Sequence, residues 1–405
     1  MGGSTFAIGL VPNYNSIGIA APIILLLLRL LQGLALGGEY GGAATYVAEH
    51  SPEGQRGYFT SWIQTTATIG FFISILVILC TRLGLGEQVF NDWGWRIPFL
   101  LSGILVILSY YIRRELDESP LFTKLKAEGK LSVNPIKESF GNKENLKLVL
   151  IALFGATAGQ GCVWYTGQFY AQIFIRDILK IEFVTANTII AIAALLATPF
   201  FVYFGRLSDT LGRKKIILGG MLLAAVSYLP IYKAMHYVGT PDKTTVVASA
   251  FVSETTESAA PSTHTLKIDK DTRTFADGFS ETTITTTHNT EKAPAPEIKS
   301  SITPPLSVSA LLVLLVFVQV LFVTMVYGPI AAFLVELFPT RIRYTSMSLP
   351  YHIGNGIFGG LTPFIATAMV ASTNNIYAGL YYPIGVALIT VVVGYWFIKE
   401  KQETI

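Results

Sequence analysis

The sequence is poor in charge and in cysteine. Only 14% of its 405 residues are charged, whereas charged residues make up about a quarter of an average globular protein. Its two cysteines, Cys80 and Cys162, both lie in apolar stretches, so neither a disulfide framework nor a cysteine-ligated metal is supported. With a net charge of +3 and no large basic cluster, the sequence also gives no indication of nucleic-acid binding.

Motifs of the common enzyme classes are also missing. The sequence contains no His-Glu-x-x-His metal site, no paired catalytic aspartates and no nucleophile elbow. We therefore expect neither an enzyme nor a bound metal or organic cofactor.

In place of charge, the sequence has long apolar runs. Hydrophobic residues make up 51% of the chain, and the mean hydropathy is +0.52. The runs have the length of about 20 residues that crosses a bilayer as a helix. Met1 to Val11 forms half a run and lacks the features of a signal peptide. The sequence predicts an all-α polytopic protein embedded in lipid, with nine full spans at about 22–47, 58–80, 95–113, 146–170, 183–204, 216–238, 306–333, 346–370 and 376–398.

The distribution of Lys and Arg predicts the orientation of these spans. Seventeen basic residues fall in one set of alternate loops and four in the other set. Because Lys and Arg concentrate in cytoplasmic loops, we expect the richer set and the C-terminus to lie in the cytoplasm.

Two connections between spans are long. Residues 114–145 carry mixed charge and divide the chain into an incomplete N-terminal bundle at 1–113 and a six-helix C-terminal bundle at 146–399. Residues 239–304 form an extracytoplasmic insertion with 23 Ser or Thr among 66 positions. This composition is typical of disorder. However, polar and apolar residues alternate at 263–270 and 281–287, on either side of Ala276-Asp277-Gly278, which is typical of a small β-hairpin; both interpretations stay open.

An internal repeat links the two bundles. Glu49 lies three residues before Pro52 where the first full span ends, and Glu336 lies three residues before Pro339 where the seventh ends. The proline stops each helix, and the glutamate is placed to reach a neighbouring helix start. The loop 205–215 precedes the second copy, whereas its counterpart in the first half would fall before Met1. We therefore expect the first two helices of the fold and part of the third to be missing from this chain.

Four stretches make the sequence similar to a known family. They are Arg29–Gly42, Tyr58–Gln64, Trp93–Phe99 and Glu336–Asn355. Together they resemble the major facilitator superfamily, and within it the bacterial metabolite:proton symporter family of proline/betaine, α-ketoglutarate and shikimate carriers. The resemblance covers the chain except for residues 239–304.

This resemblance implies twelve helices in two six-helix bundles around a central site, working by alternating access. The nine spans would be helices four to twelve of a monomeric, multi-pass protein of the bacterial inner membrane. Its ligands would be a small molecule and protons, with the proton gradient in place of a cofactor. Thr210 departs from the loop motif of the superfamily, which has Arg or Lys at this position.

Two ionisable residues of the first full span are candidates for proton coupling. Arg29 lies in a run of leucines, where an unpaired charge costs at least ~2.5 kcal/mol, so it should face the protein interior beside Gln32. Snorkelling of Arg29 to the outer interface is the alternative. The resemblance assigns the Arg-x-x-Gln-Gly motif to proton coupling. Glu39 lies between two glycine pairs and is either a proton carrier or an ion-pair partner in a packed surface.

A stripe of amides and aromatic groups on the fourth full span is the candidate binding surface. Gln160, Trp164 and Gln168 recur every four residues, with Tyr165 beside them. Two amides are not expected to face lipid, so the stripe is predicted to line a cavity, where an aromatic face can hold a quaternary ammonium group. Polar packing between helices is the alternative.

Three further polar residues come from the family motifs. We assign Gln64 and Asn355 to the predicted substrate site. His352 is a candidate proton acceptor near neutral pH, although a histidine at a helix end is more often simply hydrogen-bonded.

Charged residues at the predicted cytoplasmic helix ends are candidates for gating. Asp209 is placed to pair with Arg213 or to cap a neighbouring helix. Pairing when the cytoplasmic side is closed, and release when it opens, would bias the two states; anchoring by the basic residues is a compatible interpretation. The predicted gating set is Glu49, Arg56, Gly205, Asp209, Gly212, Arg213, Glu336 and Arg341.

Two hypotheses on function follow. The leading one is proton-coupled symport of a small polar metabolite, either an organic acid or a zwitterionic osmolyte. The competing one is a truncated, non-transporting remnant or scaffold.

Overall fold

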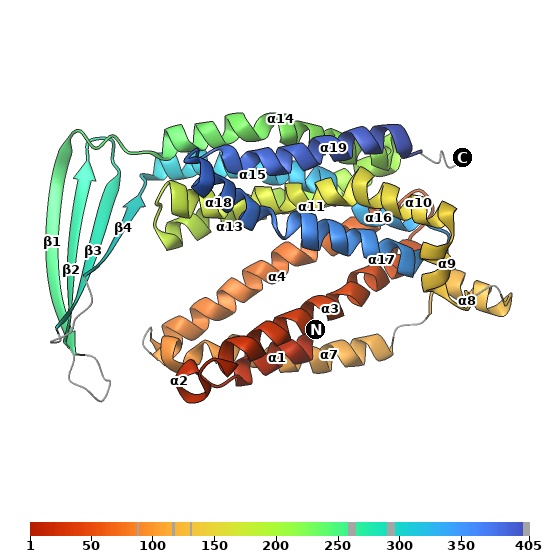
Figure 1. Ribbon diagram of the computed structural model, residues 1–405, viewed down its shortest axis with the longest axis horizontal. Coiled ribbons are helices and arrows are strands. Elements are labelled where there is room, and N and C mark those ends of the chain that lie inside the picture. The colour runs from red at the N-terminus through yellow and green to blue at the C-terminus, as the bar shows by residue number, and fades with distance from the viewer. Residues whose placement is uncertain (87–88, 116–117, 130–131, 258–264, 290–295, 400–405) are drawn as a thin grey trace.

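Long helices lie side by side along the long axis of the molecule, and a β-sheet stands at one end (Figure 1). The computed structural model describes residues 1–405 except 87–88, 116–117, 130–131, 258–264, 290–295 and 400–405. Within this described part, nine helical stretches are long and apolar enough to cross a membrane, which confirms the predicted number. They are Ala20–His50, Arg56–Leu85, Phe90–Arg114, Lys143–Ile178, Phe183–Leu211, Arg213–Gly239, Leu306–Leu337, Arg343–Thr373 and Ala378–Phe397.

The N-terminal half contains the first three of these stretches. Its elements are α1 (Gly2–Leu10), α2 (Tyr14–Ile17), α3 (Ala20–His50), α4 (Arg56–Leu85), a π-helical turn at Phe90–Gly94, α6 (Arg96–Leu100) and α7 (Ser102–Arg114). Two short helices, α8 (Pro120–Ala127) and α9 (Pro135–Gly141), follow in the predicted linker.

The C-terminal half contains the other six stretches. Several of its helices are interrupted by π-helical turns, at Leu153–Thr157, Thr166–Tyr170, Phe174–Ile178 and Gly354–Gly359. Its α-helices are α10 (Lys143–Ala152), α11 (Ala158–Tyr165), α12 (Ala171–Ile173), α13 (Phe183–Leu211), α14 (Arg213–Gly239), α15 (Leu306–Tyr327), α16 (Ile330–Leu337), α17 (Arg343–Ile353), α18 (Thr362–Thr373) and α19 (Tyr381–Phe397).

Local chemistry fixes where α13 begins. Glu182 precedes the helix, and its carboxylate accepts hydrogen bonds from the amides of Val184 and Thr185 at 2.9 and 2.8 Å. These amides have no partner within the helix. Burial raises the pKa of the Glu182 carboxyl, but the two amide hydrogen bonds outweigh burial, and the pKa is lowered overall.

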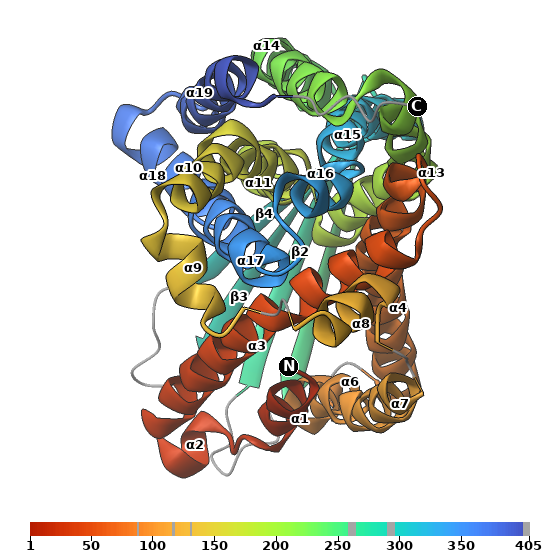
Figure 2. The same cartoon turned by 90° about the vertical axis from the view of Figure 1, so that its right-hand side faces the viewer.

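The two halves approach each other at one end of the molecule. Figure 1 shows α3 and α4 close to the C-terminal half at the end where the chain terminates, and diverging from it toward the sheet. Figure 2, which looks along the helices, shows α3 beside α17 and α4 beside α13. The contacts that join the halves therefore concentrate at the end that carries the C-terminus.

The insertion between α14 and α15 folds into a sheet. Four antiparallel strands follow one another in the order β1-β2-β3-β4. Their bounds are Val246–Glu257, Thr265–Phe275, Ser280–Asn289 and Glu297–Thr303. Of the two open interpretations, the hairpin is the one observed: β2 and β3 form it, with Gly278 at a φ of +83° in its turn. The all-α prediction thus holds for the membrane-spanning part, and β1 and β4 enlarge the hairpin beyond what was predicted.

The base of the sheet is fixed to the helices of the C-terminal half. The amide of Ile302 donates to the carbonyl of Lys180 at 2.8 Å, and the amide of Glu182 donates to the carbonyl of Ile302 at 2.9 Å. Phe275, Phe279 and Ile302 are buried together, and Val308 of α15 packs against them. The sheet is therefore anchored next to the start of α13 and the start of α15.

We expect the substitution Phe279→Ala to loosen the sheet at its base. Phe279 is 3% exposed, and truncating a buried Phe typically costs about 3 kcal/mol. Amide hydrogen exchange across β2 and β3 should accelerate, as measured by mass spectrometry. Phe251→Ala is the control, because Phe251 of β1 is 67% exposed. Equal acceleration in the two variants would contradict the assigned core of the sheet.

Candidate functional site

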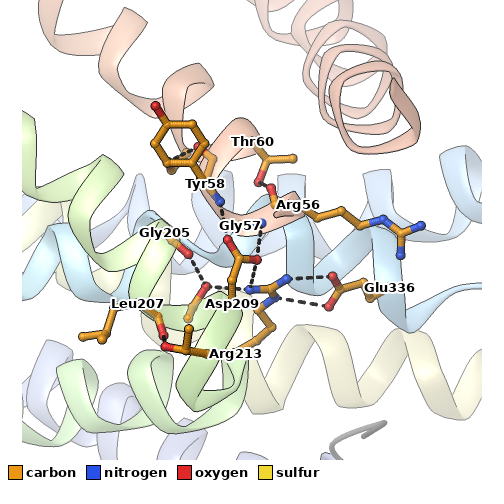
Figure 3. Close-up of polar contacts among 12 residues, drawn as sticks. Arg56, Gly57, Tyr58, Thr60, Gly205, Leu207, Asp209, Arg213 and Glu336 are labelled. Carbon is orange, nitrogen blue, oxygen red and sulfur yellow. Dashed lines mark hydrogen bonds and ion pairs between the residues drawn. The ribbon is translucent and has the colours of Figure 1, made fainter. Parts of the chain in front are cut away.

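Asp209 connects the two halves by capping α4. It lies in the last turn of α13, and its carboxylate accepts hydrogen bonds from the amides of Gly57 and Tyr58, both at 2.8 Å (Figure 3). The amides of a first helical turn have no partner within the helix, and the positive end of the helix dipole attracts a carboxylate. The cap at a neighbouring helix that the sequence predicted for Asp209 is therefore present.

Arg213 joins Asp209 to Glu336. Its guanidinium lies 2.6 Å from the Asp209 carboxylate and donates two hydrogen bonds to the Glu336 carboxylate, at 3.0 and 3.3 Å. The side chains of Asp209 and Arg213 are only 6% and 13% exposed. Gly212 opens this turn with a φ of +94°, a conformation that other residues rarely adopt. A chain of charges thus runs from the start of α4 through α13 and α14 to the end of α16.

Two glycines allow α4 and α13 to cross closely at this point. A Cβ atom at Gly57 would lie 2.6 Å from the Arg213 guanidinium, and one at Gly205 would lie 2.5 Å from the Ser61 hydroxyl. Neither distance leaves room for a side chain. Gly205, which the sequence placed in the gating set, serves here as the contact point of the two helices.

Glu49 forms a second ionic contact between the halves. Its carboxylate lies 2.6 Å from the guanidinium of Arg343 at the start of α17, and the two side chains are 3% and 10% exposed. The hydroxyl of Ser119, just before α8, donates to the same carboxylate. The repeat predicted that Glu49 reaches a neighbouring helix start, and it does so across the two halves.

Two members of the predicted gating set lie elsewhere. Arg341 pairs with Glu138 of α9 and not with a residue of the N-terminal half, because the linker helix packs against the start of α17. Arg56 opens α4, and its side chain extends away from Asp209 in Figure 3. The cross-half arginine is thus Arg343, which lies two residues beyond the one that was chosen.

The predicted polar stripe is partly a packing contact. The side chains of Gln160 and Asn355 exchange two hydrogen bonds, at 2.9 and 3.0 Å, and Gln160 has no exposed surface. Here the alternative of polar packing holds for Gln160, which fixes α11 against the turn after α17. Trp164, Tyr165 and Gln168, one to two turns further along, remain half-buried.

A row of aromatic rings crosses between the halves beside this stripe. The rings of Tyr40 and Tyr351 stack face to face with centroids 3.7 Å apart. The hydroxyl of Tyr351 lies 2.6 Å from that of Tyr327, whose ring is 6.2 Å from Trp164. Gln64, another predicted site residue, donates to the Tyr40 hydroxyl at 2.8 Å.

Sequence reasoning missed the tyrosines of this row. Tyr40 directly follows Glu39, and Tyr351 directly precedes His352, so both lie in stretches that were already singled out. One feature of the sequence could have revealed them: each copy of the repeat has an aromatic residue near the helix end that meets the other half.

The candidates for proton coupling occupy more exposed positions. Arg29 is exposed and donates to Gln32 at 3.1 Å, and Gln32 donates to Thr5 of α1 at 2.6 Å. Glu39 pairs with Arg113 of α7 at 2.8 Å, as the ion-pair interpretation expected.

His352 is half-buried, and its ring nitrogen lies 2.6 Å from the carbonyl of Ser348, one helical turn earlier. In the described part of the chain, no group of three or more metal-ligating side chains is assembled.

Comparisons with known proteins agree with this geometry. Residues 1–263 match the Major Facilitator Superfamily, and residues 290–404 match the family described as sugar (and other) transporters. A predicted proline/betaine transporter of Staphylococcus haemolyticus is 28% identical over 96% of this chain and 68% of its own length. The glycine betaine/proline/ectoine/pipecolic acid transporter OusA of Dickeya dadantii is 28% identical over 99% of this chain and 67% of its own length.

Solved structures share the fold. A double tryptophan mutant of XylE superposes with a TM-score of 0.67 at 16% identity, covering 99% of this chain and 79% of its own. The proton:xylose symporter XylE bound to a bromo-deoxyglucose gives a TM-score of 0.62 at 16% identity, over 98% and 79% of the two chains.

We expect Glu49→Gln to destabilise the folded protein. The substitution leaves the Arg343 guanidinium buried without its ionic partner, and breaking a buried pair in this way costs about 3 kcal/mol. The double variant Glu49→Gln with Arg343→Met should recover most of the loss, because it removes both charges. The free energy of unfolding, measured by titration with sodium dodecyl sulfate, distinguishes the two variants.

Glu53→Gln is the control, since Glu53 is exposed in the turn between α3 and α4. It should change the free energy of unfolding by less than about 0.5 kcal/mol. Additive losses in the double variant would show that Glu49 and Arg343 do not depend on each other.

Proposed function

Because this chain belongs to the major facilitator superfamily, we propose that it is a proton-coupled symporter. It carries a small polar metabolite across the membrane by alternating access, and a zwitterionic osmolyte is the favoured substrate over an organic acid. The names of its relatives, among them the glycine betaine and proline carrier of Dickeya dadantii, support this choice. The chain is a multi-pass protein of a bacterial inner membrane with its C-terminus in the cytoplasm.

The contacts between the halves carry this proposal. Asp209 and Glu49 join the halves at the end that holds the C-terminus, whereas α3 and α4 diverge from the C-terminal half toward the sheet (Figure 1). With the C-terminus in the cytoplasm, this arrangement is the state closed to the cytoplasm. Each contact is an ion pair or a helix cap, which can be exchanged for water when that end opens.

The aromatic row supplies a site for the substrate. Trp164 and Tyr165 are half-buried and their rings contact each other edge to face, and Gln168 lies on the same stretch of helix as an amide donor and acceptor. A quaternary ammonium group is attracted to such faces, while the carboxylate of a zwitterion needs a hydrogen-bond donor. Tyr40 precedes Glu49 on α3 and Tyr351 follows Arg343 on α17, so in this proposal the stacked pair closes the path from the site toward the cytoplasm.

Proton coupling is assigned to Arg29 and Glu39. Both carry charge on α3, and Glu39 precedes Tyr40 of the stacked pair. Protonation of Glu39 would break its ion pair with Arg113 and loosen α3 from α7. A change in the protonation of Glu39 would thus affect the position of α3, the helix that bears Tyr40 and Glu49.

Uptake into proteoliposomes tests the function directly. We expect purified protein to accumulate radiolabelled glycine betaine or proline when an inward proton gradient is imposed, and to lose the accumulation when a protonophore is added. Empty liposomes and the double variant Arg29→Gln with Glu39→Gln are the controls. Protein that stays folded, binds the substrate and yet shows no uptake would favour the remnant hypothesis.

We expect Asp209→Asn to shift the protein toward the state open to the cytoplasm. The variant weakens the cap that Asp209 of the C-terminal half provides to α4 of the N-terminal half, worth about 1 kcal/mol, which is roughly a fivefold change in the population ratio. Distances between spin labels at Glu53→Cys and Lys215→Cys, in a background without native cysteines, report this opening. Thr210→Val, at the exposed neighbouring position, is the control and should leave the distance distribution unchanged.

We expect Trp164→Ala to raise the KM for glycine betaine by about tenfold, because a cation–π contact of 1 to 2 kcal/mol is lost. Trp396→Ala is the matched control, since Trp396 is largely exposed at the far end of α19. An unchanged KM in Trp164→Ala, together with a normal signal from the control, would place the substrate elsewhere.

A further inference from the structure

The two edges of the sheet differ in how they are protected against pairing with another strand. Natural sheets protect exposed edges with charge, proline, bulges or a covering segment. On the β4 edge, Pro296 directly precedes the strand and Lys299 lies in its middle. The backbone of 180–182 also pairs with Ile302 near the end of β4. The β4 edge is thus protected in three ways.

The β1 edge lacks most of these protecting features. The stretch Ala248–Ser253 contains neither charge nor proline. A register shift lies between Val246 and Ala248, so the only bulge is at the start of the strand, and Ala248–Ser253 pairs regularly with β2. Among the described residues, no other backbone segment pairs with β1 on its outer side. Six residues in regular pairing are the length of a typical strand.

Exposed apolar side chains flank this edge. Phe251 is 67% exposed, and Val252, which points to the opposite face of the sheet, is 49% exposed. Neither side chain contributes to the small core at the base of the sheet. Side chains of this kind on both faces of a free edge can contact the side chains of an added strand.

The position of β1 excludes a second copy in the same bilayer as the occupant. Figure 1 shows β4 beside the helices and β1 farthest from them, so the free edge faces away from the membrane. Two copies joined symmetrically through β1 would have their membranes on opposite sides of the joined sheet. The occupant must therefore approach from the aqueous phase.

We propose that β1 is a docking edge for an extended segment of a partner protein in the aqueous compartment on this side of the membrane. The segment adds to Ala248–Ser253 as a fifth strand through main-chain hydrogen bonds. It is itself uncharged and rich in β-branched residues, because such residues fit an extended strand and pair favourably with apolar cross-strand neighbours such as Phe251 and Val252. This site is separate from the contacts and aromatic row assigned to transport.

A synthetic strand tests the proposal on the full-length protein in lipid nanodiscs. The probe is a fluorescent peptide of alternating threonine and valine, seven residues long, with two lysines at each end for solubility. Saturable binding is expected by fluorescence anisotropy. The same peptide with alternate backbone amides methylated should not bind, because it cannot complete the ladder of hydrogen bonds.

Phe251→Lys and Ile298→Lys form a matched pair of variants. Ile298 of β4 is 66% exposed, so both substitutions replace an equally exposed apolar side chain by the same charge, one on each edge. Phe251→Lys should weaken peptide binding by about tenfold, and Ile298→Lys by less than about twofold. Because neither side chain is packed, both variants are expected to keep the sheet, which hydrogen exchange of β2 and β3 verifies.

Four outcomes would overturn the proposal. They are the absence of saturable binding, binding of the methylated peptide, equal weakening by the two lysine variants, and formation of dimers of the protein that Phe251→Lys abolishes. The last outcome would show that a second copy occupies the edge. Uptake of glycine betaine is measured in parallel, and its loss or retention bears on the transport proposal and not on this one.

Discussion

Charge that is removed from water is the constraint on which the arrangement of the two halves depends. Asp209, Arg213, Glu49 and Arg343 are all buried enough to need partners, and Asp209, Glu49 and Arg343 each have a partner in the opposite half. Asp209 of α13 binds the amides that open α4, and Glu49 of α3 binds the arginine that opens α17. The halves separate at this end only if these groups are hydrated together or find other partners. Such an interface favours two discrete arrangements over gradual bending.

The same constraint accounts for residues that carry no charge. The cap by Asp209 requires the start of α4 to lie close to α13, and Gly57 and Gly205 have no side chains that would hold these two helices apart at their crossing. At the crossing of α3 and α17, the hydroxyl of Tyr344 donates to the carbonyl of Gly38 at 2.5 Å. The stacked pair of Tyr40 and Tyr351 lies on these same two helices. Ionic contacts, glycine crossings and aromatic rings therefore act as one interface.

What could be predicted from the sequence was local chemistry. The spans followed from length and hydropathy, and the cap by Asp209 followed from its place at a helix end beside a repeat. Arg341 was placed in the gating set and Arg343 was not, although the two are neighbours in the sequence, and the packing of α9 against α17 decides which of them meets the other half. Gln160 was predicted to line a cavity, with polar packing as the alternative, and the packing partner was not foreseen because Asn355 lies 195 residues away in the sequence. Tyr40, Tyr327 and Tyr351 were missed because tyrosines are as compatible with lipid-facing surface as with an interface.

One helix relates the sheet to the interface between the halves. α13 is 29 residues long. Glu182, whose amide binds Ile302 of the sheet, directly precedes it, and Asp209 lies in its last turn, near the crossing with α4. In the part of the chain that the structure describes, the base of the sheet contacts residues of the C-terminal half, namely 180–182 and Val308. A movement of the N-terminal half therefore leaves the sheet undistorted, whereas a tilt of α13 displaces both of its ends. Pro199 interrupts the hydrogen bonding midway along α13, so the two ends are connected through the point at which this helix bends most easily.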